Sequence, residues 1–585
     1  MCGIAGLMTA NGARFPGEVL DALASALRHR GPDGEGRHLG DGVGLIHRRL
    51  AIIDLETGAQ PMTDAAGAQL VANAEIYNYR ELRAAFPDTP FATQSDCEVV
   101  LPLYRRDGVD FARSLRGMYA LALVDRERLL LARDPFGIKP LYYAETAKGF
   151  AFASEPQALI EAGLVAARVN ARAREELLEL QFTTGAETLF EGIFRVLPGE
   201  TLVVSRGRIT ERRHLPALPS GERERQPGAE TLEDLDRVLA ESVGFHQRSD
   251  VPYGMFLSGG IDSSALLAVM ARLNERPVRA FTAGFPGTSA DDERARARHV
   301  ARALGAEHIE IEVDEADFWT LLPEIAAALD DPVADYAALP TYKLAREAGR
   351  ELKVVLCGEG GDELFAGYGR YRRAMRPPWL GGRPMRRRGF LEGLGVLRRE
   401  TRAWREGIER AERAASMPGR SRLQVAQALD CADWLPHDLL IKVDRCLMAH
   451  GVEGRTPYLD PAIARFAYPL PDRLKVRRGL GKWLLRRWLA RTLPEAEAFS
   501  RKRGFTVPVA EWLTRRGDEL APLIARSPAL AEICRPEAVE ALFRKPAVRA
   551  GLPAWSLLFY ALWHRRHVEG RRSGGDVFEV LSESA

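Results

Sequence analysis

The chain has 585 residues, of which 46% are hydrophobic and 28% charged, and a formal net charge of +2. This balance is typical of globular proteins and argues against a nucleic-acid partner or a membrane surface, so we expect neither. Single cores rarely grow beyond roughly 250–300 residues, so the length predicts about two large domains. Six scattered cysteines without a Cys-x-x-Cys pair, no secretory signal and no run of about 18 apolar residues indicate a cytoplasmic protein with reduced thiols.

Residues 1–205 are predicted to form one domain. Short apolar or alternating runs, separated by turns, indicate strands. Two segments with helical periodicity interrupt them, at 16–30 and 97–108. Strands grouped with helices in this way favour an α+β or layered α/β/α architecture. The predicted strands cover residues 43–55, 69–77, 118–125, 129–134, 149–154 and 200–205.

A second domain is predicted for residues 231–570. The stretch 206–230 before it is charged, contains Pro and Gly and lacks periodicity, which favours a linker. Strands then alternate with helices, which predicts an α/β domain with a doubly wound, mostly parallel sheet and helical additions over 425–565. Residues 571–585 are expected to be a disordered tail. The predicted strands cover 251–257, 278–285, 308–313 and 352–358, and the predicted helices 264–274, 293–305 and 341–348.

An arginine-rich segment, 370–413, has two interpretations. Arg386, Arg387 and Arg388 could belong to a nucleic-acid-binding patch or to a solvated helical face. The solvated face is favoured, because acidic residues return from Glu400 onward.

Cys2 is the first candidate for chemistry. If the initiator Met1 is removed, Cys2 becomes the first residue and carries a free α-amine. That amine titrates near pH 7.7–8.0, roughly the working pH, so it can take the thiol proton and later donate one to a leaving amine. On position alone, a small apolar residue at the chain start is the plainer interpretation.

The surrounding segments favour catalysis. MCGIAG at the start, RHRGPD (28–33), HRRLAIID (47–54), NAEIYN (73–78), SDCE (95–98) and RDPFGIKPLYY (133–143) together resemble the glutaminase domain of class II amidotransferases. These are N-terminal-nucleophile hydrolases, so the resemblance implies layered αββα architecture and a nucleophilic Cys2.

The resemblance also implies a set of glutamine-binding residues. The Asn73 side chain and the Ala74 backbone N–H would stabilise the tetrahedral oxyanion, and Asp96 and Glu75 would pair with the α-amine of glutamine. The family usually has glycine where this chain has Ala74, and alanine would be strained there if that position needs a positive φ. Arg49 would bind the α-carboxylate, and the segment Arg49, Leu50, Ala51, Ile52 and Ile53 would line the pocket.

A phosphate-binding loop is predicted at residues 258–264, which read Ser-Gly-Gly-Ile-Asp-Ser-Ser after an apolar run. Strand, glycine pair and helix form an anion cradle, because glycines let the backbone approach phosphate and the helix N-terminus presents free N–H groups. Asp262 is placed to hold Mg²⁺. The loop resembles the pyrophosphate-binding motif of ATP pyrophosphatases, which cleave ATP between the α- and β-phosphates. The predicted ATP contacts here are Ser258, Gly259, Gly260, Asp262, Ser263 and Ser264.

A second glycine-rich segment, LCGEGGDELFAGY (356–368), carries several carboxylates and suits a Mg²⁺–nucleotide site. It resembles the Ser-Gly-Glu-Gly-x-Asp-Glu motif of the same enzymes. That resemblance makes Asp362 the second Mg²⁺ ligand and assigns Glu359 to acyl-adenylate formation. Two positions depart from the motif, Cys357 for serine and Ala366 for glycine. Leu257, Ala283, Cys357 and Gly358 would contact the nucleotide.

Residues 442–460, 481–487 and 500–513 resemble the synthetase region of glutamine-hydrolysing asparagine synthetases. The resemblance places Lys482 where a cation faces developing negative charge. It implies ATP-dependent amidation of aspartate with ammonia from glutamine, through an acyl-adenylate, and suggests a homodimer. Alternatives remain: amidation of another carboxylate, a β-lactam synthetase-like cyclase, or a sensor with inactive sites. No local motif marks the acceptor pocket.

Overall fold

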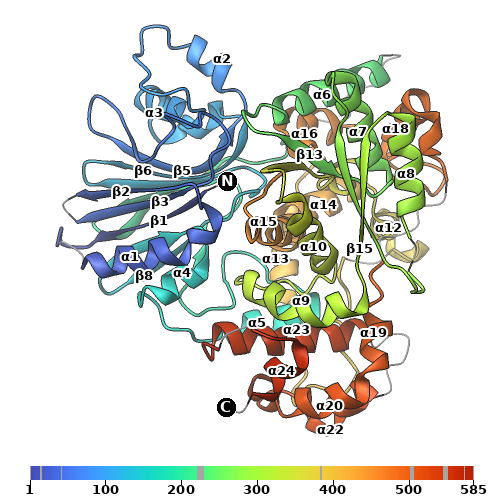
Figure 1. Ribbon diagram of the computed structural model, residues 1–585. Helices are drawn as coiled ribbons and strands as arrows, with labels where there is room; N and C mark the ends of the chain where they lie inside the picture. The colour runs from blue at the N-terminus through green and yellow to red at the C-terminus, as the bar shows by residue number, and fades with distance from the viewer. Residues whose placement is uncertain are drawn as a thin grey trace.

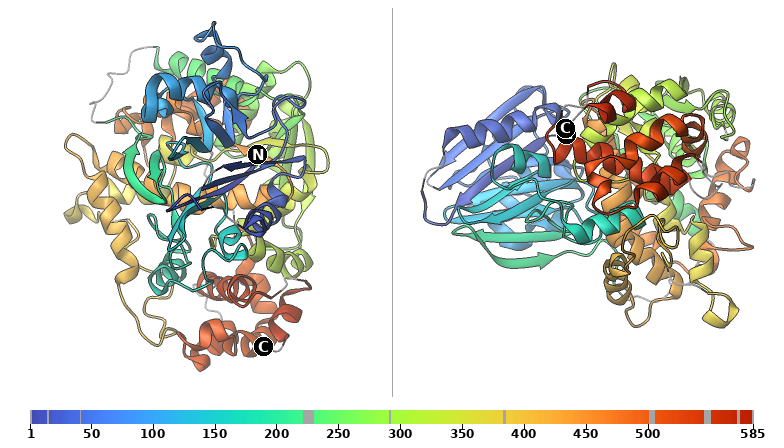
Figure 2. Two further views of the ribbon diagram at one scale, coloured as in Figure 1. Left: turned by 90° about the vertical axis from the view of Figure 1, so that its left-hand side faces the viewer. Right: turned by 90° about the horizontal axis from the view of Figure 1, so that it is seen from below.

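The protein is described by a computed structural model. It covers residues 2–13, 16–40, 42–220, 230–290, 292–382, 385–500, 506–544, 551–571 and 574–583. The N-terminal sheets lie beside a larger C-terminal half, and the last helices gather at one end of that half (Figure 1; Figure 2, right). Within the described ranges, no helix is both long enough and apolar enough to cross a membrane.

The N-terminal domain contains two six-stranded antiparallel sheets. The order of the first is β10-β8-β9-β1-β3-β2 and of the second β12-β11-β7-β6-β5-β4. The strands of the first sheet are β1 (Gly3–Thr9), β2 (Gly34–Gly40), β3 (Val43–Arg49), β8 (Tyr142–Thr146), β9 (Gly149–Ala153) and β10 (Phe194–Arg195). Those of the second are β4 (Met62–Thr63), β5 (Gln69–Ile76), β6 (Gly117–Asp125), β7 (Arg128–Arg133), β11 (Glu200–Ser205) and β12 (Arg208–His214).

The two sheets stack face to face between helices. Alternation along β1 explains the layers, because Ile4 and Met8 point into the core between the sheets, whereas Ala5 and Leu7 face α1. On the outer face of the second sheet, α3 covers a separate core. This is the expected αββα arrangement. The helices are α1 (Gly17–Ala26), α2 (Tyr79–Ala84), α3 (Val100–Asp107), α4 (Pro156–Glu161) and α5 (Ala171–Leu180).

The C-terminal domain is built on a parallel sheet of order β15-β14-β13-β16-β17, with helices on both faces. Successive residues of β16 separate the two faces: Val354 and Leu356 enter the core with α6 and α7, whereas Val355 enters the core with α9 and α10. The doubly wound prediction is confirmed. The strands are β13 (Tyr253–Phe256), β14 (Arg279–Gly284), β15 (Glu307–Glu312), β16 (Val354–Leu356) and β17 (Glu453–Arg455).

The helices of this domain fall into two sets. Those of the strand–helix alternation are α6 (Thr231–His246), α7 (Ile261–Leu273), α8 (Arg294–Ala303), α9 (Glu315–Ala328) and α10 (Ala338–Ala348). The later ones are α11 (Gly361–Phe365), α12 (Gly369–Ala374), α13 (Glu406–Ala415), α14 (Arg422–Leu429), a π-helix (Asp430–Leu439), α15 (Leu440–Met448), α16 (Pro461–Ala467), α17 (Asp472–Lys475), α18 (Trp483–Thr492), α19 (Val509–Arg515), α20 (Gly517–Ala525), α21 (Pro528–Ala531), α22 (Pro536–Arg544), α23 (Gly551–His567) and α24 (Val577–Ser582).

Three segments differ from expectation. The first part of the predicted linker is β12, which pairs with β11 as an edge strand of the second sheet; its charged residues fit an exposed edge. The tail predicted to be disordered contains α24, which starts with a capping box at Asp576 and buries Val577. The strand β17 was not predicted, because Glu-Gly-Arg has no apolar pattern; it is buried beside β16 in the sheet, and its Glu453 and Arg455 form an ion pair.

Candidate active sites

Cys2 immediately precedes β1 and is 8% exposed. Its backbone N donates to Asn73 Oδ1 at 3.0 Å, and Arg30 Nε donates to its carbonyl at 3.2 Å. Its Sγ faces the Leu50 carbonyl at 4.0 Å. Burial raises the pKa of the Cys2 thiol, so a nearby base is needed to form the thiolate. Met1 lies outside the described residues.

Strand β5 places Asn73 and Ala74 beside this cysteine. The Asn73 side chain is fully buried, and its Nδ2 has no hydrogen-bond partner in the described parts of the chain. The N–H groups of Ala72 and Ile76 donate to Gln60 Oε1 and Asp96 Oδ2, each at 2.6 Å, and therefore point to one edge of the strand. Because the N–H direction alternates along a strand, the Ala74 N–H faces that same edge. An unused amide donor and an edge N–H beside a thiol are the groups that an oxyanion requires.

The substitution at Ala74 does not strain the backbone. Ala74 lies inside β5 with regular antiparallel pairing to Tyr119, and it is not among the residues with positive φ. Glycine is therefore not required at this position by the conformation seen here.

The predicted head-group residues of the glutamine site are only partly assembled. Asp96 is buried, and burial raises its pKa to about 6. Glu75 is ion-paired with Arg455 of the other domain, with Oε2 and Nη2 2.8 Å apart. Arg49 donates to the carbonyls of Ile53, Asp54 and Leu55.

The segment after Arg49 packs against the other domain. Leu50 and Ile52 pack in a core shared with the C-terminal domain, Ala51 N donates to Asp33 Oδ2 at 2.8 Å, and Ile53 is half-buried.

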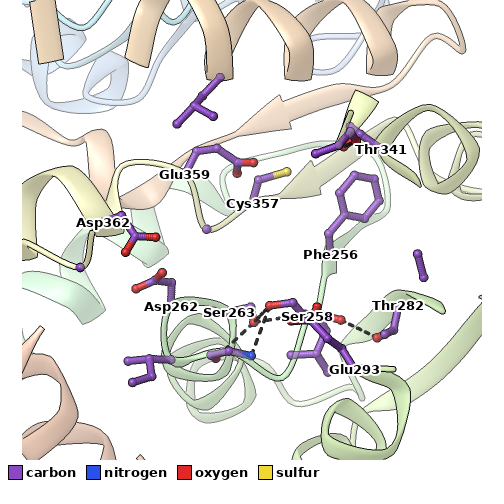
Figure 3. A pocket seen from close by; sticks show the side chains of 18 of the residues that line it. Phe256, Ser258, Asp262, Ser263, Thr282, Glu293, Thr341, Cys357, Glu359 and Asp362 are labelled. Atoms are coloured by element: carbon purple, nitrogen blue, oxygen red, sulfur yellow. Dashed lines mark hydrogen bonds between the residues drawn. The ribbon is translucent and has the colours of Figure 1, made fainter. Parts of the chain in front are cut away.

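The second site is a cavity of about 1060 Å³ at the carboxyl edge of the parallel sheet. Open parallel sheets bind ligands at this edge. Figure 3 shows Ser258 and Ser263 on one side of the cavity and Glu359 and Cys357 on the other. Gly259 and Ser264 are not among the described residues that line it. The predicted residues that do are Leu257, Ser258, Gly260, Asp262, Ser263, Ala283, Cys357, Gly358, Glu359, Asp362 and Lys482.

The loop after β13 is shaped by short contacts. Gly259 has a φ of +66°, and an added Cβ would lie 2.8 Å from Ala297 N, so only glycine fits. Ser258 Oγ accepts from Gly260 N at 3.2 Å and lies 3.0 Å from Ser263 Oγ. The loop leads into α7, whose free N–H groups at its start favour an anion.

Asp262, Asp362 and Lys482 meet at one end of this cavity. Lys482 Nζ contacts the Asp262 carboxylate and lies 2.8 Å from Asp362 Oδ1. Figure 3 shows the two carboxylates facing each other. The approach needs glycines: a Cβ at Gly361 would lie 2.7 Å from Asp262 Cγ, and one at Gly367 would overlap Asp362. Two opposed carboxylates suit Mg²⁺, which keeps several waters and takes its other ligands from phosphates.

Two further carboxylates lie in the same wall. Burial raises the pKa of Glu359, and it raises the pKa of Glu363 to about 7. Tyr368 OH donates to Glu363 Oε1 at 2.7 Å. Nearby Ala366, where the motif commonly has glycine, has a φ of 59°, which explains that preference.

Sequence reasoning missed the other end of the cavity. The residues of this part of the lining come from three distant segments, and of these residues only Lys442 lies in a segment that the sequence analysis had singled out. They are Asp335, Tyr336, Phe390, Trp434 and Lys442.

Three arginines pack inside the fold, where they pair with carboxylates or stack on an aromatic ring. Arg445 pairs with Asp330 and Asp444 at 2.7 and 2.9 Å, in a buried network that also includes Arg30. Arg386 stacks on Trp434, with its guanidinium carbon 3.9 Å from the ring centroid. Arg387 and Arg388 are exposed, but residues 386–388 are not helical and Arg386 is half-buried, so the predicted solvated helical face is wrong for this part of the segment.

Comparison with known proteins adds to this geometry. A family model described as asparagine synthase matches residues 234–565, and one described as a glutamine amidotransferase domain matches residues 1–215.

The chain belongs to the asparagine synthase family. It is 31% identical to glutamine-hydrolysing asparagine synthetase 1 of Bacillus subtilis, over 95% of this chain and 94% of that protein. It is 29% identical to asparagine synthetase B of Escherichia coli, over 83% and 78%. It is also 32% identical to a protein of Gibberella zeae named amidase chry2, over 64% and 60%. This asparagine synthase family member is therefore a ligase, a glutamine-dependent amidotransferase of the asparagine synthetase type.

Proposed function

We propose that this enzyme converts aspartate to asparagine with nitrogen from glutamine. ATP activates the β-carboxylate as an acyl-adenylate, pyrophosphate leaves, and ammonia then displaces AMP. The proposal is supported by two chemically distinct sites in one chain and by membership of the asparagine synthase family.

In the first half-reaction, removal of Met1 frees the α-amine of Cys2, which takes the thiol proton. The thiolate attacks the side-chain amide of glutamine. The oxyanion accepts hydrogen bonds from Asn73 Nδ2 and the Ala74 N–H. Ammonia leaves, and water hydrolyses the glutamyl thioester. The buried Asn73 Nδ2, for which the described residues offer no hydrogen-bond partner, supports this role.

The glutamine head group is bound by charge. Asp96 and Glu75 accept hydrogen bonds from its α-ammonium, and Arg49 turns from the loop carbonyls to its α-carboxylate. The exposure of Arg49 is intermediate, which supports this rearrangement.

In the second half-reaction, the 258–264 loop and the start of α7 hold the ATP phosphates. Asp262 and Asp362 would hold Mg²⁺, which would neutralise charge at the phosphates. Lys482 stabilises the negative charge that develops as pyrophosphate leaves. Glu359 lies beside the carboxylate that is activated.

The observation that carries the proposal is the convergence of Asp262, Asp362 and Lys482. They come from α7, α11 and the residue before α18, and they meet at the end of the cavity that adjoins the Ser-Gly-Gly loop. A buried cation between two carboxylates is an arrangement suited to a triphosphate–Mg²⁺ complex.

A second candidate is amidation of a larger carboxylic acid. Tyr336, Phe390 and Leu552 separate the main cavity from an adjoining hollow of about 450 Å³. This hollow could take an acceptor side chain longer than that of aspartate.

The test is to supply the enzyme with aspartate, ammonium and Mg²⁺–ATP and measure all products. We expect asparagine, AMP and pyrophosphate in equal amounts. Formation of ADP and phosphate would contradict the adenylate mechanism. Pyrophosphate release with other acids but not with aspartate would favour the second candidate.

A further inference from the structure

The lining of the synthetase cavity holds an ion pair that the mechanism above does not use. Lys442, on α15, lies with its Nζ 2.6 Å from Oδ2 of Asp335, in the loop before α10. The two residues are 107 positions apart, and both line the cavity together with Glu359. Their side chains are 7% and 16% exposed, so the pair is largely shielded from bulk water and open mainly to the cavity.

The surroundings of the pair keep both charges in place. Asp335 and Asp438 hold the pKa of Lys442 above its ordinary value against burial, so Lys442 stays protonated. Behind it, the Asp438 carboxylate is fully buried, and neither oxygen has a hydrogen-bond partner among the described residues. Asp335 Oδ1 accepts from Ala337 N at 2.9 Å, which orients the carboxylate. One cation and one anion are therefore presented side by side at a fixed position.

This arrangement is complementary to the head group of an α-amino acid. An ammonium has three N–H donors and a carboxylate has about four acceptor positions, so each partner can bind a second ion without breaking the pair. An α-carboxylate placed at Lys442 and an α-ammonium placed at Asp335 would form two charge-assisted hydrogen bonds in a shielded site. Aromatic side chains of Tyr336 and Trp434 line the same cavity and limit the access of water.

The position of the pair also orients the group that reacts. Glu359 also lines this cavity, close enough for the Lys442 charge to lower its pKa. A head group held at Lys442 and Asp335 would leave the side-chain carboxylate free to reach the proposed adenylation centre at Asp262 and Lys482, which lines the same cavity.

We propose that Lys442 and Asp335 form the binding site for the α-amino acid head group of the acceptor, with Lys442 on the α-carboxylate and Asp335 on the α-ammonium. The inference rests on the proposed amidation reaction and adds the class of acceptor, an amino acid with a side-chain carboxylate. Dicarboxylic acids that lack the α-ammonium should therefore be poor acceptors. Amines that lack the α-carboxylate should be poor acceptors too.

The test measures ammonium-dependent pyrophosphate release with aspartate, succinate and 3-aminopropanoate. Succinate lacks only the α-ammonium, and 3-aminopropanoate lacks only the α-carboxylate. For the wild-type enzyme, we expect KM to be about 10- to 100-fold higher for either analogue than for aspartate. In Asp335→Asn the preference for aspartate over succinate should disappear, and in Lys442→Gln the preference over 3-aminopropanoate should disappear.

A matched control is available in the Lys343–Asp317 pair, which is also about 15% exposed but lies outside the cavity-lining set. Lys343→Gln should leave all three KM values unchanged. Thermal unfolding of each variant reports whether the synthetase domain is folded. The analogue series on the wild-type enzyme remains decisive even if a variant does not fold.

The outcomes separate this inference from the proposed function. If aspartate is used but both variants keep the wild-type preferences, or wild type accepts succinate as well as aspartate, the head-group site is wrong and the function stands. If aspartate is inert but another amino acid with a side-chain carboxylate is used, and the two variants lose the matching preferences, the site is supported and the aspartate assignment fails. Turnover only with acids that lack an α-amino acid head group would overturn both.

Discussion

The carboxylate of Glu75 and the guanidinium of Arg455 meet across the domain boundary, with Oε2 and Nη2 2.8 Å apart and both side chains buried. Arg455 also pairs with Glu453 at 2.6 Å, and its carbonyl accepts from Cys357 N at 2.8 Å. One residue therefore connects β5, which carries the proposed oxyanion-hole residue Asn73, to Cys357 in the lining of the C-terminal cavity.

We predict that Arg455→Met destabilises the protein strongly, because two buried carboxylates would lose their cation. Breaking a buried pair by removing one partner costs about 3–5 kcal/mol. Urea unfolding measures the change in the free energy of unfolding. Arg113→Met is the control: Arg113 is 69% exposed and pairs with Asp110 on the surface, so its loss should cost less than about 1 kcal/mol. Equal losses in the two variants would contradict this interpretation of the interface.

Asn73→Ala should impair glutamine hydrolysis selectively. Loss of one oxyanion donor typically lowers kcat by about 10²–10³-fold. Ammonium-dependent pyrophosphate release should be unchanged, because that reaction occurs in the other domain. Steady-state assays of glutamate formation give the comparison, with the exposed Asn11→Ala as a matched amide control. A fall in both reactions would point to a structural role for Asn73 instead.

The pH dependence of glutamine binding should follow Asp96. Burial raises its pKa to about 6, and only the ionised form can pair with an ammonium. The KM for glutamine should therefore rise as the pH falls through 6, by about tenfold per pH unit below it.

The Asp96 carboxyl should affect folding stability in the opposite sense: lowering the pH weakens glutamine binding but increases the contribution of Asp96 to the stability of the fold. A carboxyl whose pKa is higher in the folded state stabilises the fold below its unfolded pKa, and that contribution is lost as the pH rises through about 6.

The role of Asp96 in glutamine binding is checked by measuring the KM for glutamine against pH for wild type and Asp96→Asn. The variant should have a high KM without the step near pH 6. A wild-type KM that stays flat from about pH 5 to 8 would remove Asp96 from the glutamine site.

Lys482→Met should abolish most amide synthesis while sparing glutamine hydrolysis. Removal of a cation from a charge-developing centre lowers kcat by about 10²–10³-fold. The variant also leaves Asp262 and Asp362 facing each other without their buried cation, so added Mg²⁺ should raise its Tm more than that of wild type. A thermal-unfolding titration with Mg²⁺, with Lys343→Met as control, measures this. Identical shifts in all three proteins would argue against a metal site at these carboxylates.

Local patterns predicted the parts of each site that are contiguous in sequence. Ser258 to Ser264 could be recognised because strand, glycine pair and helix follow one another directly. The pairing of Glu75 with Arg455, and of Asp335 with Lys442, joins segments far apart in the chain, and no spacing rule links them. The strand β17 escaped prediction because its three residues carry no apolar pattern; they are buried by parallel pairing with β16 and by α15 side chains packed over Gly454. The helix at 577–582 escaped because a short amphipathic segment near a chain end looks the same as a tail until its packing partners are known.

The most direct test of the two-site account compares asparagine formation by wild type and Cys2→Ala with glutamine or ammonium as the nitrogen source. Wild type should use both sources. Cys2→Ala should make no asparagine from glutamine but should keep the wild-type rate with ammonium, because the synthetase cavity is intact. Asparagine made from glutamine by Cys2→Ala, or an equal loss with both sources, would contradict the assignment of the two half-reactions to separate sites.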